Sequence, residues 1–147
     1  MESDAKIMLL YDKDPSIAYK NLQELESLSE ASNDLYPYLD EFLAMLKSEK
    51  YVLRVRGFRL LCKQAKWDTA NRINGEIDTI LQALDDEKPT AVRQKLKALE
   101  DIVLCKKALH QKIRDRVLSL DDLRFQDTMH PLIQQDIQKL LYVMDCE

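Results

Sequence analysis

Residues 51–66 read YVLRVRGFRLLCKQAK, and this stretch decides how the rest of the chain is interpreted. Its apolar side chains recur at steps of three and four residues, which is the spacing of one face of an α-helix. The same stretch holds five basic residues and no acidic residue, in a chain whose net charge is −4. We therefore expect an amphipathic helix with an apolar stripe on one side and a basic face on the other.

Similar helical patterns flank this stretch along the whole chain. Helix-start signals precede several of them, as at Asp14–Pro15, Pro89 and Pro131. No segment alternates polar and apolar residues over the length of a strand. With only two glycines and four prolines in 147 residues, the chain has few of the turns that a β-rich fold requires. These features predict an all-α protein of about eight helices.

The predicted helices repeat as antiparallel pairs. One repeat shift relates the two middle pairs and takes Leu39, Phe42, Leu43 and Leu46 to Ile77, Ile80, Leu81 and Leu84. A slightly shorter shift relates the first pair to the middle ones, and a slightly longer shift relates the last pair to them. A period of about 38 residues made of two antiparallel helices predicts an α-solenoid. We expect one domain over residues 1–147, with units at about 5–32, 36–68, 70–107 and 109–145.

Two segments resemble the HEAT repeat: LAMLKSEKYVLRVRGFRLL at residues 43–61 and LQALDDEKPTAVRQKLKAL at residues 81–99. Each contains a first helix, a short charged turn, and valine and arginine near the start of a second helix. The resemblance covers nearly the whole chain, and residues 36–78 look like a family of small uncharacterised bacterial HEAT-type proteins. It implies an α-α superhelix of the HEAT/armadillo type whose second helices line a concave surface, and it brings no established activity.

Charge is segregated along the chain. The net charge is −7 over residues 1–49, +6 over residues 50–112 and −3 over residues 113–147. Helical spacing places basic residues of the stretch 51–66 on one face, and the matching helix of the next unit adds two more basic residues. If second helices line a concave surface, these residues and one tryptophan form a basic strip: Arg56, Arg59, Lys63, Lys66, Trp67, Arg93 and Lys97.

The basic strip has two interpretations. It would bind an acidic protein face or peptide if its charges are available to a ligand. Alternatively it is a solvated face whose cations pair with the acidic helices, with Trp67 packed against the turn between repeats. The acidic turn at residues 85–87 is expected to face an arginine, either Arg93 within its own unit or Arg56 in the neighbouring unit. Metal binding by this turn is a second, weaker interpretation.

The sequence contains no motif for catalysis or for a cofactor. His110 and His130 lack a ligand partner three or four residues away, and the three cysteines form no CxxC pair. Glycine-rich phosphate loops and nucleophile motifs are absent from the sequence. We therefore expect no catalytic residue, no metal and no cofactor.

These observations favour a non-catalytic interaction or scaffold module whose partner is another protein. Two alternatives stay open: a nucleic-acid-binding protein that resembles the HEAT-like DNA alkylation-repair glycosylases in architecture, and a regulatory subunit that holds a partner enzyme. An isoelectric point near 5.3 argues against a polyanion as ligand. No run of apolar residues is long enough for a membrane span and no signal peptide is evident, so we expect a cytosolic protein.

Overall fold

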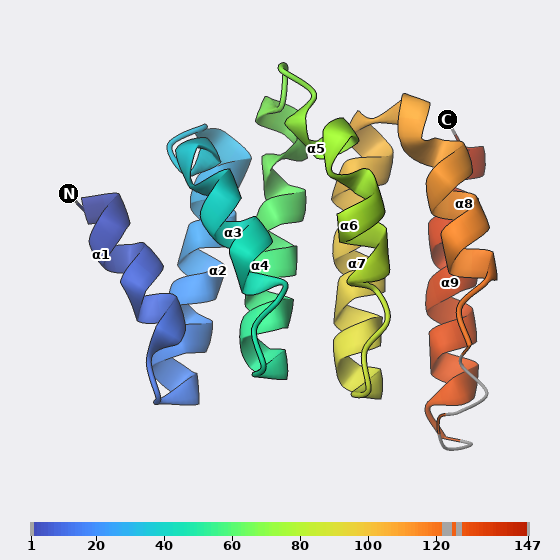
Figure 1. The fold of residues 1–147 in the computed structure, drawn as a ribbon, viewed down its shortest axis with the longest axis horizontal. Coiled ribbons are helices and arrows are strands. Elements are labelled where there is room, and N and C mark those ends of the chain that lie inside the picture. The colour runs from blue at the N-terminus through green and yellow to red at the C-terminus, as the bar shows by residue number, and fades with distance from the viewer. Residues whose placement is uncertain (1, 122–124, 126–127, 147) are drawn as a thin grey trace.

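A computed structural model describes residues 2–121, 125 and 128–146. All regular secondary structure within these residues is helical, which confirms the all-α prediction (Figure 1). Nine α-helices are described, one more than expected, together with four short 3-10 segments. The α-helices are α1 Glu2–Met8, α2 Pro15–Ala31, α3 Leu39–Met45, α4 Tyr51–Lys63, α5 Arg72–Gly75, α6 Ile77–Gln82, α7 Pro89–Cys105, α8 His110–Leu118 and α9 His130–Asp145. The 3-10 segments are Leu9–Tyr11, Tyr36–Tyr38, Gln64–Trp67 and Lys107–Leu109.

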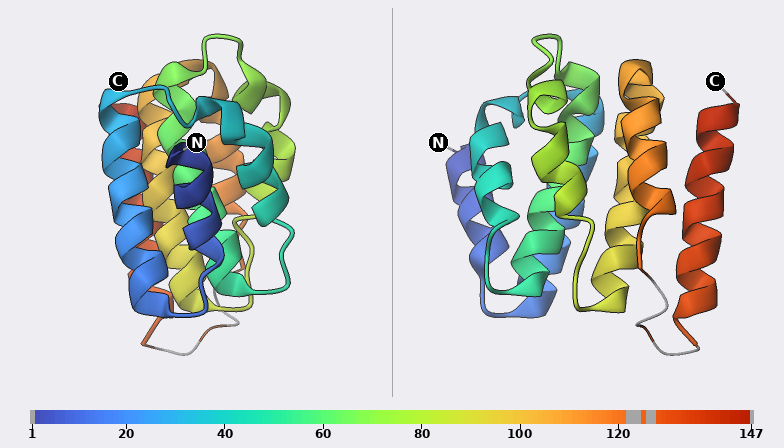
Figure 2. Two further views of the ribbon diagram at one scale, coloured as in Figure 1. Left: turned by 90° about the vertical axis from the view of Figure 1, so that its left-hand side faces the viewer. Right: turned by 45° about the vertical axis from the view of Figure 1, so that its right-hand side comes forward.

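The helices lie in two rows (Figures 1 and 2). The second-helix row contains α2, α4, α7 and α9 side by side, while α3, α6 and α8 form a first-helix row in front of it in Figure 1. Each helix of the second-helix row packs against the next one, and α4 also packs against α3. Residues 51–66 therefore supply the helix, α4, that contacts α2, α3 and α7 together.

The additional helix, α5, is a single turn that a buried aspartate starts. The carboxylate of Asp68 accepts hydrogen bonds from the backbone N–H groups of Arg72 and Ile73 at 3.0 and 2.9 Å. It also accepts one from the Tyr36 hydroxyl at 2.5 Å and forms an ion pair with Lys106 at 3.1 Å. Tyr36 lies just before α3 and Lys106 just after α7, so this carboxylate joins two pairs of helices as well as capping α5.

One apolar core runs through all of the helix pairs. Its fully buried side chains come from both rows and recur at the repeated positions of the sequence. They include Leu10, Leu22, Phe42, Phe58, Leu61, Ile80, Leu96, Leu99 and Leu140. No helix among the described residues is long and apolar enough to cross a membrane.

Gly57 lets α4 approach α3 closely. A Cβ atom added at this position would lie 2.5 Å from Met45 Cβ and 2.9 Å from the backbone oxygen of Phe42. Both of these atoms are fixed to the backbone of α3, so neither helix can avoid the clash by rotating a side chain. The presence of Gly57 is thus explained by close helix packing rather than by a turn.

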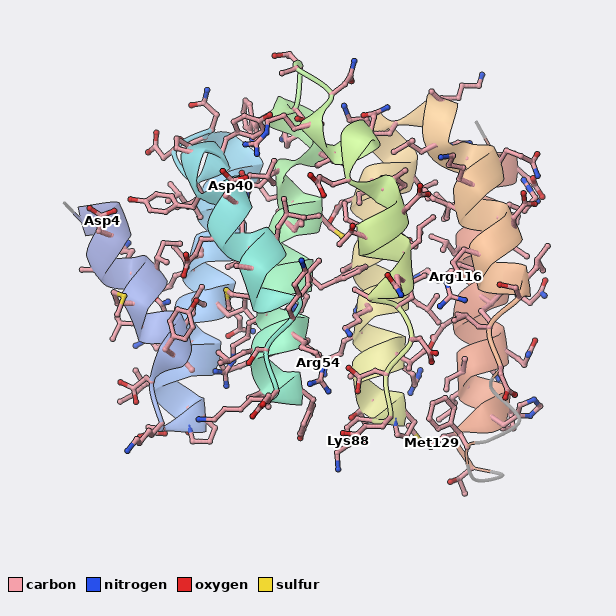
Figure 3. All side chains as sticks on the ribbon, in the orientation of Figure 1. Asp4, Asp40, Arg54, Lys88, Arg116 and Met129 are labelled. Carbon is pink, nitrogen blue, oxygen red and sulfur yellow. The ribbon has the colours of Figure 1, made fainter. Side chains whose placement is uncertain are left out.

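The acidic turn between α6 and α7 meets a different arginine from the two expected. Asp86 accepts hydrogen bonds from Nε and Nη2 of Arg54 at 3.0 and 3.1 Å, near the beginning of α4 (Figure 3). The expected partners bind elsewhere, since Arg56 donates to the backbone oxygen of Leu10 and Arg93 pairs with Asp136. Arg54 lies in the first turn of α4, at the end of the helix that faces the turn, and this position decides the pairing.

Asp86 also neutralises a buried lysine. Nζ of Lys95 lies 3.1 Å from Asp86 Oδ2 and donates to the backbone oxygen of Ala83 at 2.7 Å. The side chains of Lys95 and Asp86 are each only 1% exposed. Burial lowers the pKa of Lys95, and the nearby Asp86 opposes that effect. A buried charge of this kind needs such a partner, because its desolvation would otherwise destabilise the fold.

Candidate functional site

Two adjoining hollows open on the second-helix row. The larger, of about 720 Å³, lies over α2, α4 and α7, and the smaller, of about 420 Å³, lies over α7 and α9. They share Gln94, Lys97 and Glu100, so we treat them as one second-helix groove. The larger hollow is lined by Tyr19, Gln23, Glu26, Ser27 and Glu30 of α2, Arg59 and Lys63 of α4, and Gln94, Lys97, Ala98, Glu100, Asp101 and Leu104 of α7. The smaller adds Thr90, Arg93, Asp136 and Lys139.

The groove contains four of the seven residues of the basic strip. Arg59, Lys63 and Lys97 line the larger hollow, and Arg93 lines the smaller one with Lys97. Arg56, Lys66 and Trp67 line neither hollow. The strip is therefore not one continuous basic surface, and the role of each member follows from the groups that it contacts.

Arg59 connects three helices across the larger hollow. Its Nε and Nη2 atoms donate to the two carboxylate oxygens of Glu26 on α2 at 3.0 and 2.7 Å. Nη1 donates to Oε1 of Gln94 on α7 at 3.1 Å, and the guanidinium carbon lies 5.7 Å from the centre of the Tyr19 ring. A bidentate pair of this kind is geometrically specific, so most of the hydrogen-bonding capacity of Arg59 is used inside the protein.

Lys63 holds a second set of contacts between the same helices. Its Nζ atom lies 2.5 Å from Glu30 on α2 and 3.5 Å from Asp101 on α7. Burial raises the pKa of Asp101 above its ordinary value, although Lys63 acts in the opposite direction. The carboxylate of Glu30 has a lowered pKa, chiefly because of its hydrogen bond with Lys63. Lys63 therefore balances two acids from two neighbouring helices.

The three strip residues outside the groove bind the first unit. Nη1 of Arg56 donates to the backbone oxygen of Leu10 at 2.8 Å. Nζ of Lys66 donates to the backbone oxygen of Glu30 at 2.6 Å and lies 5.1 Å from the centre of the Trp67 ring. Trp67 is half-buried, and its indole N–H donates to the backbone oxygen of Ser29 at 2.7 Å. These contacts attach α4 and the 3-10 segment Gln64–Trp67 to α2 and to the 3-10 segment Leu9–Tyr11.

Lys97 differs from the other cations of the groove. Arg93 pairs with Asp136 at 2.7 Å, and Lys139 lies 3.8 Å from Glu100. Lys97 is exposed at the junction of the two hollows and, within the described part of the chain, forms no hydrogen bond or ion pair. Each acidic residue that lines the groove is already paired with another cation. Five cations and five carboxylates line the groove, and Lys97 is the one cation among them with no direct partner in the described part of the chain.

The residues of α2 in the groove were missed by the sequence reasoning, although the repeat contained the signal for them. Moving back by one repeat takes Arg59, Lys63 and Lys66 to Gln23, Ser27 and Glu30, and moving forward by one repeat takes them to Lys97, Asp101 and Leu104. All six shifted positions line the larger hollow. The helical wheel of a single helix showed the basic face, whereas the repeat shift identifies the acidic and apolar residues beside it.

The chemistry available in the groove is ion pairing, hydrogen bonding and apolar contact. No group of three histidine, cysteine, aspartate or glutamate side chains suited to a metal ion occurs among the described residues. Cys62 is buried, and burial raises the pKa of its thiol well above the ordinary value. His110 lies outside the groove, with Nε2 2.7 Å from the backbone oxygen of Val103. Comparisons with protein-family models, with curated proteins and with solved structures find no match to this chain.

Proposed function

We propose that this protein is a HEAT-type α-solenoid that acts as a non-catalytic interaction module, and that the second-helix groove binds an acidic segment of another protein. The observation that carries the proposal is the exposed ammonium group of Lys97 at the junction of the two hollows, which has no hydrogen bond or ion pair among the described residues. A carboxylate of the partner would pair with this ammonium group without displacing any internal contact.

Polar contacts between units support the solenoid part of the proposal. Side chains bond to groups one repeat away, as in Arg54 with Asp86 over 32 residues and Lys106 with the Asp68 backbone oxygen over 38 residues. Arg116 similarly reaches the backbone oxygen of Leu81 over 35 residues (Figure 3). These separations approach the repeat period of the sequence. Successive helices of the second-helix row pack against one another, as stacked repeats do.

The position of the groove supports its role as a binding face. It lies over the second helix of each pair, which is the row that lines the binding surface in repeat arrays of this class. It is open to solvent and spans the four helices α2, α4, α7 and α9, so an elongated segment can contact several units together. The acidic side chains of the same groove, among them Glu26, Glu30 and Asp101, favour a protein segment over nucleic acid. A chain of phosphates would bring many negative charges against them, whereas a protein segment can present a single carboxylate to Lys97.

Charge reversal at Lys97 tests this proposal. Because Lys97 is exposed and has no internal partner among the described residues, Lys97→Glu should change the free energy of unfolding by no more than about 0.5 kcal/mol. It should also strongly reduce the recovery of partner proteins by affinity capture from cells that make the protein. Arg56→Glu and Arg59→Glu are less suitable, since each would break contacts that hold the helices together.

Lys47→Glu is the matched control. Lys47 is exposed in the turn before α4 and lines neither hollow, so this variant makes the same charge change outside the groove. The proposal requires that the control retain the captured proteins that Lys97→Glu loses. Recovery of the same proteins in the same amounts with both variants would show that the groove is not the binding face.

A further inference from the structure

We infer that the segment bound by the groove carries a single carboxylate for Lys97 and a large apolar side chain about 10 Å away for Leu104, rather than a run of acidic residues. This inference rests on the proposed function and specifies the class of partner. It follows from two side chains of the groove. The ammonium group of Lys97 has no hydrogen bond or ion pair among the described residues, and the side chain of Leu104 is exposed.

The charge balance of the groove limits the partner to one acid. Arg59, Lys63, Arg93 and Lys139 each already face a carboxylate of the protein, at distances between 2.5 and 3.8 Å. The groove is lined by as many carboxylates as cations, five of each. A run of acidic residues on the partner would therefore be repelled by carboxylates as much as it is attracted by cations. Only Lys97, among the described cations that line the groove, does not already face a carboxylate.

Leu104 supplies an apolar contact in the same hollow. Its side chain is 57% exposed, although most leucines of the second-helix row are buried in the core. It lines the larger hollow together with Ala98 and Lys97, which also belong to α7. The other large exposed hydrophobic side chain of this hollow, Tyr19, already faces the guanidinium group of Arg59. An apolar side chain of a partner would remove the exposed surface of Leu104 from water.

The geometry of α7 fixes the spacing between the two contacts. Lys97 and Leu104 are seven residues apart on one helix, which is two turns and about 10.5 Å along the helix axis. An extended peptide covers this distance in about three residues, and a helical peptide covers it in about seven residues. The expected ligand therefore has one aspartate or glutamate and one large apolar residue at either of these separations.

Selection from a random dodecapeptide library displayed on phage tests this inference. The wild-type chain serves as the target, and Lys97→Glu is used to remove peptides that bind elsewhere. We expect the enriched peptides to contain one acidic residue, with leucine, isoleucine, methionine or phenylalanine at the separations given above. Synthetic copies of these peptides should bind about tenfold or more weakly to Lys97→Met and to Leu104→Ser than to the wild type.

Two matched controls accompany these variants. Lys47→Met removes an exposed lysine outside the groove, and Leu118→Ser removes an exposed leucine on α8, in the other row of helices. Both should bind the peptides as the wild type does. Enriched peptides with runs of acids, whose binding requires Lys97 but not Leu104, would overturn the inference and leave the proposed function standing. Peptides that bind equally well to Lys97→Met would overturn both.

Discussion

At the scale of single residues, Gly57 is the point where two helices come closest together. An alanine there would place its Cβ atom 2.5 Å from Met45 Cβ and 2.9 Å from the backbone oxygen of Phe42. We expect Gly57→Ala to lower the free energy of unfolding by about 1–3 kcal/mol, even though alanine is favoured over glycine in a helix by about 1 kcal/mol. Urea denaturation followed by circular dichroism measures this change.

Gly75→Ala is the control for that prediction. A Cβ atom at Gly75 has no neighbouring heavy atom within 4 Å, and neither glycine has a positive φ angle. This variant should be as stable as the wild type or more stable by up to about 1 kcal/mol. Equal effects of the two substitutions would show that helix approach does not explain Gly57.

A second residue-scale prediction concerns Asp86 and acid. Burial by itself would raise the pKa of Asp86, but Arg54, the backbone N–H of Lys88 and Lys95 lower it to about 2. An aspartate in an unfolded chain has a pKa near 3.9, so the unfolded state binds more protons between these values. The contribution of Asp86 is therefore present above about pH 4 and is lost as the pH falls towards about 2.

Asp86→Asn isolates this contribution. We expect the difference in unfolding free energy between the wild type and Asp86→Asn to be largest near neutral pH and to narrow as the pH falls below about 4. Thermal or urea unfolding across this pH range measures the difference. If the difference in unfolding free energy between the wild type and Asp86→Asn stays constant with pH, Asp86 is not ionised in this network. Glu87→Gln is the control, because it removes an exposed carboxylate of the same turn and leaves the buried Asp86 in place.

At the scale of helices, the repeated apolar positions should carry most of the stability. Leu99 of α7 is fully buried, and Leu81 of α6 is 5% exposed. Leu99→Ala and Leu81→Ala should each lower the free energy of unfolding by about 2–5 kcal/mol, because each leaves a cavity in the shared core. Leu118→Ala, at an exposed position of α8, should change it by about 0.5 kcal/mol or less. Near-neutral results at both buried positions would contradict the helix register.

At the scale of the whole molecule, the helices pack mainly with their neighbours in the row. α9 packs against α7 and α8, whereas α4 packs against α2, α3 and α7. Ile137→Ala, at a buried position of α9, should therefore lower hydrogen-exchange protection in α8 and α9 more than in α4. Leu61→Ala, at a buried position of α4, should lower protection in all of the helices. Equal loss throughout the chain in both variants would indicate a single cooperative unit.

The sequence by itself determined the helices, because helical periodicity depends only on residues within a few turns of one another. It placed the apolar stripe of residues 51–66. The repeat shift also identifies the groove positions related to Arg59. The short helix α5 was not predicted, since it depends on Asp68 and on the left-handed backbone of Asn71, with φ of 57°. Such a capping contact leaves little trace in hydrophobic periodicity.

Only the tertiary structure decided which charges are available. The helical wheel placed Arg59, Lys63 and Lys97 on equivalent faces, yet only Lys97 has no partner among the described residues. The partners of Arg59 and Lys63 lie 33 residues away on α2, and the distance between them depends on how the two helices are set against each other. Local sequence patterns do not determine how α2 and α4 are positioned relative to each other. The packing of α2, α4, α7 and α9 therefore leaves Lys97 as the one cation of the basic strip with no hydrogen bond or ion pair among the described residues.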